Sequence, residues 1–402
     1  MQPSIIIEEE IGFIPYFRWL FLMILLGSST VQLRASEGAY QSLSSAGLDL
    51  AYNLQFKEAT DVFNQLIRLQ PDNPHGYLLQ SVNYYYRYQL EENHKVFGKQ
   101  FQQFVLRAVE KSKRSLTDPD KKINALFYTG TAFMYLAAYH GWESEWLKAY
   151  WYGRKGIEYL ERVVQEDSTY YDAYLGLGLY HYYTDIIPRY AKPLTFVLGI
   201  ENNREKGLQE LQLAAKHGTY SKAEALLFLG TIFLYLEKDY DVALNYFEAL
   251  AKLYPQNASF LMLLGENYQK LNRNKEALNT LNQIVKKVDI PVFPVLVISS
   301  YYRIGNLYLN MKNPDEAINN YEKSMQYASL STGNVKWVFA LSNLNIGRSY
   351  ETMGKRQEAV AYYKKVKRSH HKHAYEIAQK RLEKAGQGLN FTEPASFIEV
   401  GN

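Results

Sequence analysis

The sequence contains no cysteine, and proline is scarce, with 12 among 402 residues. Disulfides, thiolate metal ligands and a cysteine nucleophile are therefore excluded. The P-loop, Gly-x-Ser-x-Gly and His-Glu-x-x-His motifs are missing too, and Gly176-x-Gly178 lacks the third glycine of a dinucleotide site. Glu143 and Glu145 fall in an insertion, where a loop explains them better than the acid pair of a carbohydrate enzyme. We therefore predict no cofactor, no metal site and no catalytic activity.

Strong charge is also absent, since the formal net charge is only +4. This balance gives no reason to expect nucleic acid as a partner. Hydrophobic residues make up 47% of the chain, as in an ordinary folded protein. Tyrosine is the abundant residue, with 36 copies. Because tyrosine combines a large ring with a hydroxyl group, it suits both core packing and recognition.

The N-terminal segment has an apolar run from Trp19 to Gly27, preceded by Arg18 and followed by small polar residues. This pattern is typical of a secretory signal. The run is shorter than the roughly 20 apolar residues that a membrane span needs. We predict that residues 1–35 form a signal peptide or an N-terminal anchor. The chain is then exported to the periplasm or cell envelope, or held at a membrane by its N-terminus.

A repeated spacing dominates the rest of the chain. Three glycines are each followed 12 residues later by alanine, and four residues after that by leucine or tyrosine. The three sets are Gly265, Ala277 and Leu281; Gly305, Ala317 and Tyr321; and Gly347, Ala359 and Tyr363. This spacing resembles the tetratricopeptide repeat (TPR), in which small residues let two antiparallel helices touch closely.

Five further copies precede these three, around Gly47, Pro74, Gly130, Gly176 and Gly230. The first keeps the same spacing, the middle three are degenerate, and the last has one extra residue. The resemblance implies an all-α, right-handed superhelical solenoid of about eight helix-turn-helix repeats. We expect an N-terminal array with insertions over 40–220 and a regular array over 223–373. A polar-backed capping helix over 374–386 and a flexible tail over 387–402 would complete the chain.

The central segment carries a second resemblance. It contains a Gly-x-Gly helix at Gly176, then Pro188, an apolar stretch, and the motif Arg204-x-x-Gly207-Leu208. This order is similar to the eukaryotic inclusion-body-clearance family, TPR proteins also described as mitochondrial outer-membrane-like. The resemblance implies a cargo or lipid-associated adaptor. The apolar connector over 186–200 would pack onto the solenoid, cover its groove or touch a membrane.

In TPR proteins the first helix of each repeat lines the inner groove. Position 13 of the first five repeats would be Tyr52, Tyr86, Tyr135, His181 and Tyr235, with Tyr180 at position 12 of the fourth. The last three repeats carry Lys270, Asn310 and Thr352 at position 13 instead.

We therefore predict a non-catalytic scaffold whose tyrosine-lined concave groove binds a peptide or a partner protein. Tyr302 and Arg348, at positions 5 and 9 of repeats seven and eight, extend the predicted partner-binding set. The lysine-asparagine clamp of chaperone-binding TPR domains is absent. The alternatives are that the tyrosines pack between repeats, or that they bind carbohydrate.

The C-terminal end is basic, because residues 354–384 contain ten Lys or Arg and three Glu. We predict a membrane or anion contact there through Lys364, Lys365, Lys367 and Arg368. A membrane-associated adaptor using this end and the apolar connector is therefore an alternative function. His370, His371 and His373 lie beside it, and a solvated basic joint explains them better than a metal site.

Overall fold

The computed structural model describes residues 35–185, 203–287, 293–333 and 335–386. The predicted signal or anchor, the connector over 186–200 and the tail over 387–402 lie outside these ranges. Within them, seventeen α-helices and one π-helical segment occur, and no strand. The prediction of an all-α fold is confirmed.

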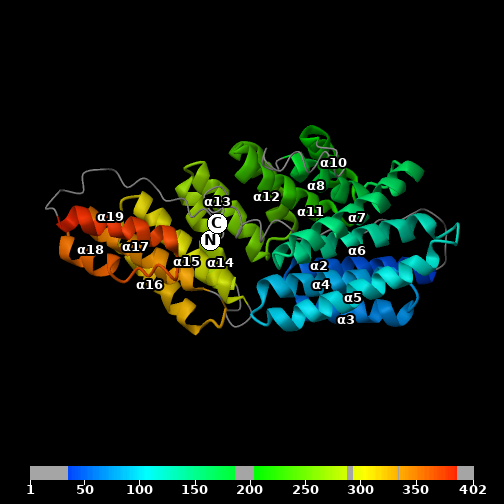
Figure 1. Ribbon diagram of the computed structural model, residues 1–402, viewed down its shortest axis with the longest axis horizontal. Helices are drawn as coiled ribbons and strands as arrows, with labels where there is room; N and C mark the ends of the chain where they lie inside the picture. The colour runs from blue at the N-terminus through cyan, green and yellow to red at the C-terminus, as the bar shows by residue number, and fades with distance from the viewer. Residues whose placement is uncertain (1–34, 186–202, 288–292, 334, 387–402) are drawn as a thin grey trace, which may run out of the picture. The chain divides into compact units, whose positions relative to one another are not determined.

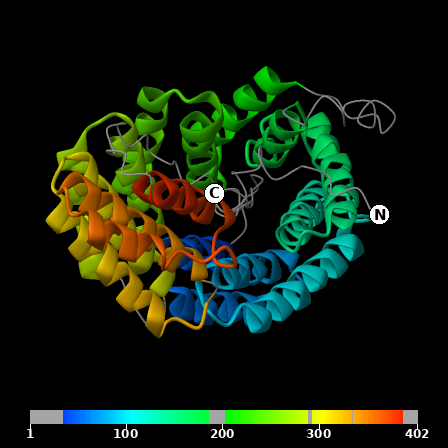
Figure 2. The same ribbon diagram turned by 60° about the vertical axis from the view of Figure 1, so that its left-hand side comes forward.

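The helices form eight consecutive pairs followed by one last helix (Figure 1). Figure 2 shows the same pairs from another direction. The first four pairs are α2 (Ala35–Tyr52) with α3 (Phe56–Leu69), α4 (Pro74–Leu90) with α5 (His94–Ser115), α6 (Lys122–Trp142) with α7 (Trp146–Glu166), and α8 (Ala173–Asp185) with α10 (Arg204–His217). The fifth is α11 (Lys222–Thr231), continued by the π-helix η1 (Ile232–Glu237), with α12 (Tyr240–Leu253). The last three are α13 (Ala258–Lys270) with α14 (Asn274–Lys287), α15 (Pro294–Asn310) with α16 (Pro314–Leu330), and α17 (Lys336–Thr352) with α18 (Arg356–Tyr363), before α19 (Lys372–Gly386). This order is that of a TPR solenoid.

The contacts divide the chain into two compact units. Among the described residues, the N-terminal unit comprises 35–89 and 93–254, and the C-terminal unit comprises 255–386 together with Leu90–Glu92. The fifth repeat, which the sequence assigns to the regular array, therefore belongs to the N-terminal unit. The boundary between the two units lies one repeat later than the boundary between the two arrays that the repeat spacing indicates.

Except in α4 with α5, each pair closes where a glycine on the first helix meets a large side chain on the second. A Cβ atom at Gly347 would lie 2.5 Å from the Tyr363 ring, and one at Gly305 would lie 2.7 Å from the Tyr321 ring. Both distances are shorter than real contacts, so the two helices need glycine at these points. The second helices are amphipathic, as in α3, which buries Phe56, Ala59, Phe63 and Leu66 along one face.

The extra residue in the fifth repeat is accommodated by η1. A π-helical turn holds one more residue than an α-helical turn, so the inserted residue is absorbed without shifting the partner helix. The segment ends at Lys238, whose φ of 57° is left-handed. Its last residue, Glu237, is thereby brought to the side of α8 and α10, where it forms contacts described below.

Among the described helices, none has both the length and the apolar character that crossing a membrane requires.

Candidate functional site

The interior of the N-terminal unit is filled by the predicted tyrosines. The hydroxyl of Tyr86 on α4 donates a hydrogen bond to Oε1 of Glu224 on α11, at 3.1 Å. The ring of Tyr52 lies 4.9 Å from that of Tyr254, whose hydroxyl donates to Asp49 at 3.3 Å. The first two repeats therefore contact the fifth directly, and the N-terminal unit closes on itself.

A second set of contacts closes the same interior. His75, at the start of α4, is buried among the rings of Tyr40, Tyr128 and Tyr220, with centroids between 5.5 and 5.7 Å away. Burial lowers the pKa of His75 to about 3, so this imidazole is neutral at physiological pH. It packs as an apolar ring rather than as a cation.

Asp172, before α8, joins the fourth repeat to the fifth. Its carboxylate accepts backbone N–H bonds from Thr219, Tyr220 and Ser221 at 3.2, 2.9 and 2.7 Å. Burial raises the pKa of Asp172 to about 6, although these three donors favour the charged form. The carboxylate holds the turn that begins α11, and thereby places Glu224 opposite Tyr86.

These contacts correct the predicted groove of the first three repeats. Tyr52, Tyr86 and Tyr135 expose only 3%, 1% and 1% of their surfaces. They lie in the core of the unit and do not line an open surface. This is the arrangement expected if the tyrosines pack between repeats. The reason is long-range, because closure on the fifth repeat covers positions that an open solenoid would expose. Tyr180 and Tyr235 are partly exposed.

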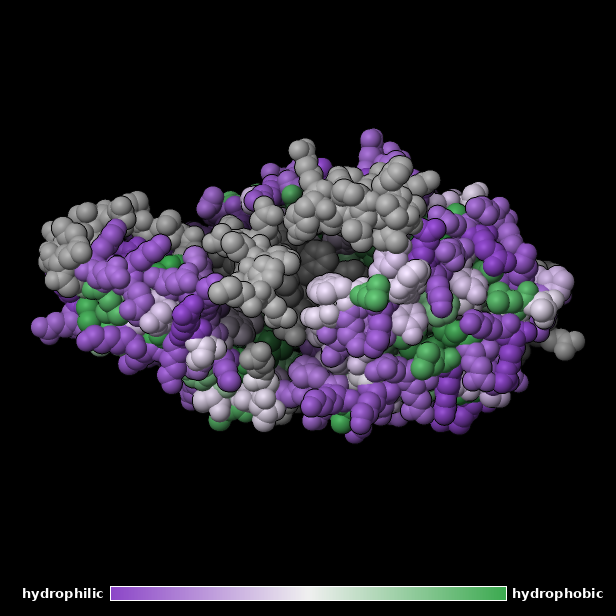
Figure 3. Space-filling view, viewed as in Figure 1, coloured by the Kyte–Doolittle hydropathy of each residue, from purple (hydrophilic) through white to green (hydrophobic). Residues whose placement is uncertain are grey.

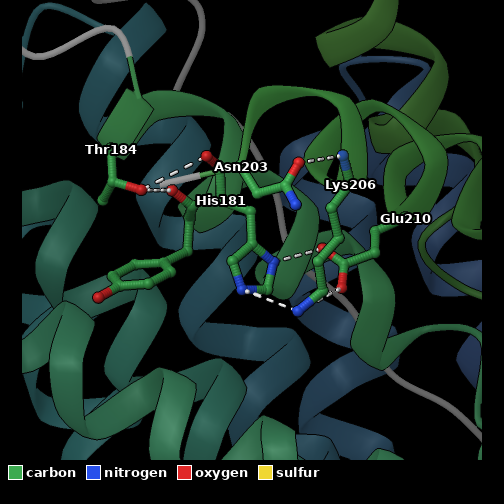
Figure 4. A network of polar contacts seen from close by, with 6 residues as sticks. His181, Thr184, Asn203, Lys206 and Glu210 are labelled. Carbon is green, nitrogen blue, oxygen red and sulfur yellow. Dashed lines mark hydrogen bonds and ion pairs between the residues drawn. The ribbon is translucent and has the colours of Figure 1, made fainter. Parts of the chain in front are cut away.

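His181, at the next position of this series, forms a buried polar network between α8 and α10 (Figure 4). Its Nδ1 lies 2.6 Å from Oε2 of Glu210, and its Nε2 lies 3.4 Å from Nζ of Lys206. With Nδ1–H donating to the carboxylate and Nε2 accepting from the ammonium, a neutral imidazole satisfies both partners. Asn203 caps α10 by accepting the Lys206 N–H at 2.9 Å.

The Gly-x-Gly and Arg-x-x-Gly-Leu motifs occur at the same helix crossing. A Cβ at Gly178 would lie 2.8 Å from the carbonyl oxygen of Gly207, so glycine is needed where α8 and α10 cross. Arg204 pairs with Glu237 of η1, which also accepts the Tyr182 hydroxyl at 2.5 Å. Helix packing thus explains the motif residues that the structure describes.

The C-terminal unit carries a row of polar side chains across three successive first helices. Oε2 of Glu266 on α13 lies 2.8 Å from Nη2 of Arg303 on α15. Asn345 on α17 donates from Nδ2 to Oδ1 of Asn306 at 3.1 Å. Arg348 donates from Nη1 to Oδ1 of Asn345 at 3.2 Å. We call Glu266, Arg303, Asn306, Asn345 and Arg348 the polar row.

The polar row joins two of the predicted site residues. Asn345 donates to the Tyr302 hydroxyl at 3.1 Å, so Tyr302 and Arg348 meet through one amide. Asn306 also accepts the hydroxyl of Tyr321 at 2.7 Å. Tyr302, Asn345 and Arg348 are buried, whereas Asn306 and Arg303 are partly exposed. The row therefore has a fixed inner part and an accessible edge.

Burial sets the electrostatics of the polar row. It lowers the pKa of both Arg303 and Arg348, because a guanidinium loses hydration in the interior. Beyond the row, burial raises the pKa of Glu351, which pairs with Arg381 of α19 at 3.1 Å. Partly desolvated guanidinium and amide groups bind carboxylates and peptide groups more strongly than fully hydrated ones do.

Sequence reasoning missed Arg303 and Asn345, because they occupy position 6 of repeats seven and eight. That position is not among those assumed to line the groove. A signal was present, since two consecutive repeats place a polar residue at this position between two apolar neighbours. Glu266 is at position 9 of repeat six, the position for which Arg348 was selected in repeat eight, so the same criterion would have selected Glu266.

The basic end is exposed as the sequence suggests. Lys364, Lys365, Lys367 and Arg368 are all exposed, and Lys365 lies over the Tyr362 ring at 3.7 Å. His371 accepts the backbone N–H of Ala374 through Nδ1, at the start of α19. In the described ranges, no three His, Asp or Glu side chains gather in a way that could hold a metal ion.

Comparisons with known proteins agree with the architecture. Three sequence models described as tetratricopeptide repeat match residues 202–258, 234–289 and 296–369. One crystal structure, of the APC/C hetero-tetramer Cut9-Hcn1, matches with a TM-score of 0.53 and 14% identity, over 88% of this chain and 57% of that chain. At this identity the match shows the fold alone.

Two further matches are more limited. The response regulator aspartate phosphatase H of Bacillus subtilis (strain 168) is 26% identical over 150 residues, which cover 35% of this chain and 39% of that protein. The structure of YrrB, a TPR protein with an unusual peptide-binding site, matches with a TM-score of 0.37 and 17% identity, over 58% of this chain and 98% of that one. This chain thus spans less than half of the phosphatase and just over half of the Cut9-Hcn1 chain. None of these matches supports the inclusion-body-clearance family. The three sequence models show that the chain carries tetratricopeptide repeats over much of residues 202–369, within an all-helical TPR solenoid.

Proposed function

We propose that this chain is a non-catalytic scaffold that binds a peptide, or an extended segment of a partner protein, along the polar row of its C-terminal unit. The carrying observation is that polar side chains link three successive first helices in two steps, Glu266 to Arg303 and Asn306 to Asn345. Such an arrangement presents fixed donors and acceptors at a regular spacing. An extended peptide has donors and acceptors at a regular spacing too.

The chemistry of the row favours a segment with an acidic side chain or a free carboxylate. Asn306 offers the donors of its amide nitrogen, because its Oδ1 already accepts from Asn345 and Tyr321. Arg303 can add a charge-assisted bond at the accessible edge. Arg303 already pairs with Glu266, so an incoming carboxylate would share the guanidinium with it or displace it. The hydrogen bonds within the row hold these side chains in place before a partner arrives, which lowers the entropy cost of binding.

Other parts of the predicted function stay proposals. A groove lined by tyrosine would have to use the partly exposed Tyr180 and Tyr235, since the other three are buried. The exposed basic side chains of Lys364, Lys365, Lys367 and Arg368 support the alternative of a membrane-associated adaptor. Burial of the tyrosines argues against the carbohydrate-binding alternative. Export to the cell envelope rests on the N-terminal sequence alone.

A displayed library of random peptides tests the polar row directly. The full chain should enrich a defined set of peptides that contain Asp or Glu. Asn306→Asp keeps the shape of the side chain and adds a negative charge to the row, so affinity for the enriched peptides should fall at least tenfold. Asn319→Asp makes the same chemical change on the exposed face of the second helix α16 and should bind as the wild type does. Failure to enrich any set, or an equal loss in both variants, would overturn the proposal.

A further inference from the structure

The first two turns of α7 present large apolar side chains to solvent. Trp146, Leu147 and Trp151 expose 64%, 71% and 55% of their surfaces, and Tyr150 between them is partly exposed. We call these four residues the α7 stripe. Much of the surface seen in Figure 3 is hydrophilic, with hydrophobic residues in small separate groups. The stripe gathers three of the exposed large hydrophobic side chains of the described residues within six residues of one helix, which indicates an interaction surface.

The stripe is exposed because the opposite face of α7 is committed to α6. Gly156 lies so close to α6 that a Cβ there would be 2.8 Å from the sulfur of Met134. Tyr152 stacks on His140 at 5.2 Å between centroids. Residues 146, 147, 150 and 151 follow the spacing of the other helix face, so no rotation of α7 could bury them without breaking the pair.

The charged residues within the span of the stripe are basic, and Glu145 and Glu158 lie at its two ends. From residue 146 to 157 the helix contains Lys148, Arg154 and Lys155 and no acidic residue. Lys148 pairs with Glu145 at 2.6 Å, and Arg154 pairs with Glu158 at 3.2 Å, both at exposed or partly exposed positions. Such surface pairs are weak and exchange readily with another anion. Lys155 is exposed, with its ammonium 5.8 Å from the Phe133 ring centroid.

We propose that the α7 stripe docks on the surface of a lipid bilayer that contains anionic headgroups. Tryptophan and tyrosine prefer the boundary between headgroups and acyl chains, and lysine and arginine beside them reach the phosphates. An aromatic and basic helix face of this kind lies in the interface without crossing it. This inference is independent of the polar row and goes beyond the proposed scaffold function.

The small size of the α7 stripe favours a bilayer over a folded protein as its binding partner. A stable protein interface takes about 20–30 residues from each side, whereas the stripe supplies four side chains on two helical turns. Insertion of single side chains into a fluid interface needs no matching surface, and each buried aromatic residue contributes separately. A stripe too small for a protein interface is sufficient to hold the chain against a membrane.

The absence of cysteine permits a local test in the full chain. Leu147→Cys carries one environment-sensitive fluorophore in the stripe, and Leu106→Cys carries it at a site on α5 that is exposed to 52%. With vesicles of phosphatidylcholine and phosphatidylglycerol in a 3:1 ratio, the label at 147 should shift to the blue and brighten at least twofold. The label at 106 should not change. High salt or pure phosphatidylcholine should weaken the response at 147.

Two additional measurements decide the outcome. Trp146→Ser/Trp151→Ser in the Leu147→Cys background should abolish the response while leaving helicity unchanged. No response at 147 with any vesicle, or equal responses at 147 and 106, would overturn the proposal. The same holds if the label responds only to a protein fraction, which would identify a protein as the partner.

Discussion

Single residues control how closely the helices of a repeat approach. Gly347 is the clearest case, because a methyl group there would lie 2.5 Å from the Tyr363 ring, which is itself fully buried. We expect Gly347→Ala to lower the free energy of unfolding by about 1–3 kcal/mol, the usual cost of overpacking. Urea denaturation followed by circular dichroism measures this change.

Gly38 supplies the matched control for this substitution. It lies in α2, and a Cβ atom there would have no neighbour within 4 Å. Gly38→Ala should therefore stabilise the helix by about 0.5–1 kcal/mol, since alanine loses less backbone entropy than glycine. If both substitutions changed stability in the same direction, close contact would not be the reason for glycine at 347.

At the scale of helices, the buried pair of His181 and Glu210 fixes α8 against α10. Removing one partner leaves a buried polar group unsatisfied, so Glu210→Leu should lower the free energy of unfolding by about 3 kcal/mol. His181→Leu/Glu210→Leu removes both groups and should recover at least half of that loss. A double-mutant cycle by urea denaturation measures the coupling. Equal stability of the single and double variants would show that the pair does not join the helices.

Helix pairing was largely predictable from the sequence, because it depends on local spacing. The interval from Gly347 to Tyr363 reports a contact between helices that are neighbours in the chain, and the same interval recurs at Gly305 and Tyr321. The extra residue near Gly230 was also visible. Its accommodation in η1 was not, because a π-helical turn depends on how α11 and α12 pack against both neighbouring repeats.

The whole N-terminal unit shows why the predicted groove could not be read from the repeats. The rule for inner positions places Tyr86 correctly on the inner side of α4. It does not indicate what lies opposite, which is Glu224, 138 residues later in the chain. Closure of the unit depends on the cumulative rotation of five irregular repeats, and no short-range pattern encodes that rotation. In the C-terminal unit, two residues selected by the same rule, Tyr302 and Arg348, each hydrogen-bond Asn345.

Closure makes a prediction about how the N-terminal unit unfolds. An open solenoid loses its end repeats independently, because each repeat contacts only its neighbours. A bond from the second repeat to the fifth couples them, so both should open together.

Tyr86→Phe removes the hydrogen bond to the buried Glu224 carboxylate and should lower the free energy of unfolding by about 1–3 kcal/mol. Amide hydrogen exchange, followed by mass spectrometry, should then become faster in α4 and in α11 alike. Tyr85→Phe is the control, because the buried Tyr85 hydroxyl interacts with Gln89 of its own helix and its loss should leave exchange in α11 unchanged. If Tyr86→Phe accelerates exchange in α4 but not in α11, the bond is a local contact and the unit opens from its ends like any linear array.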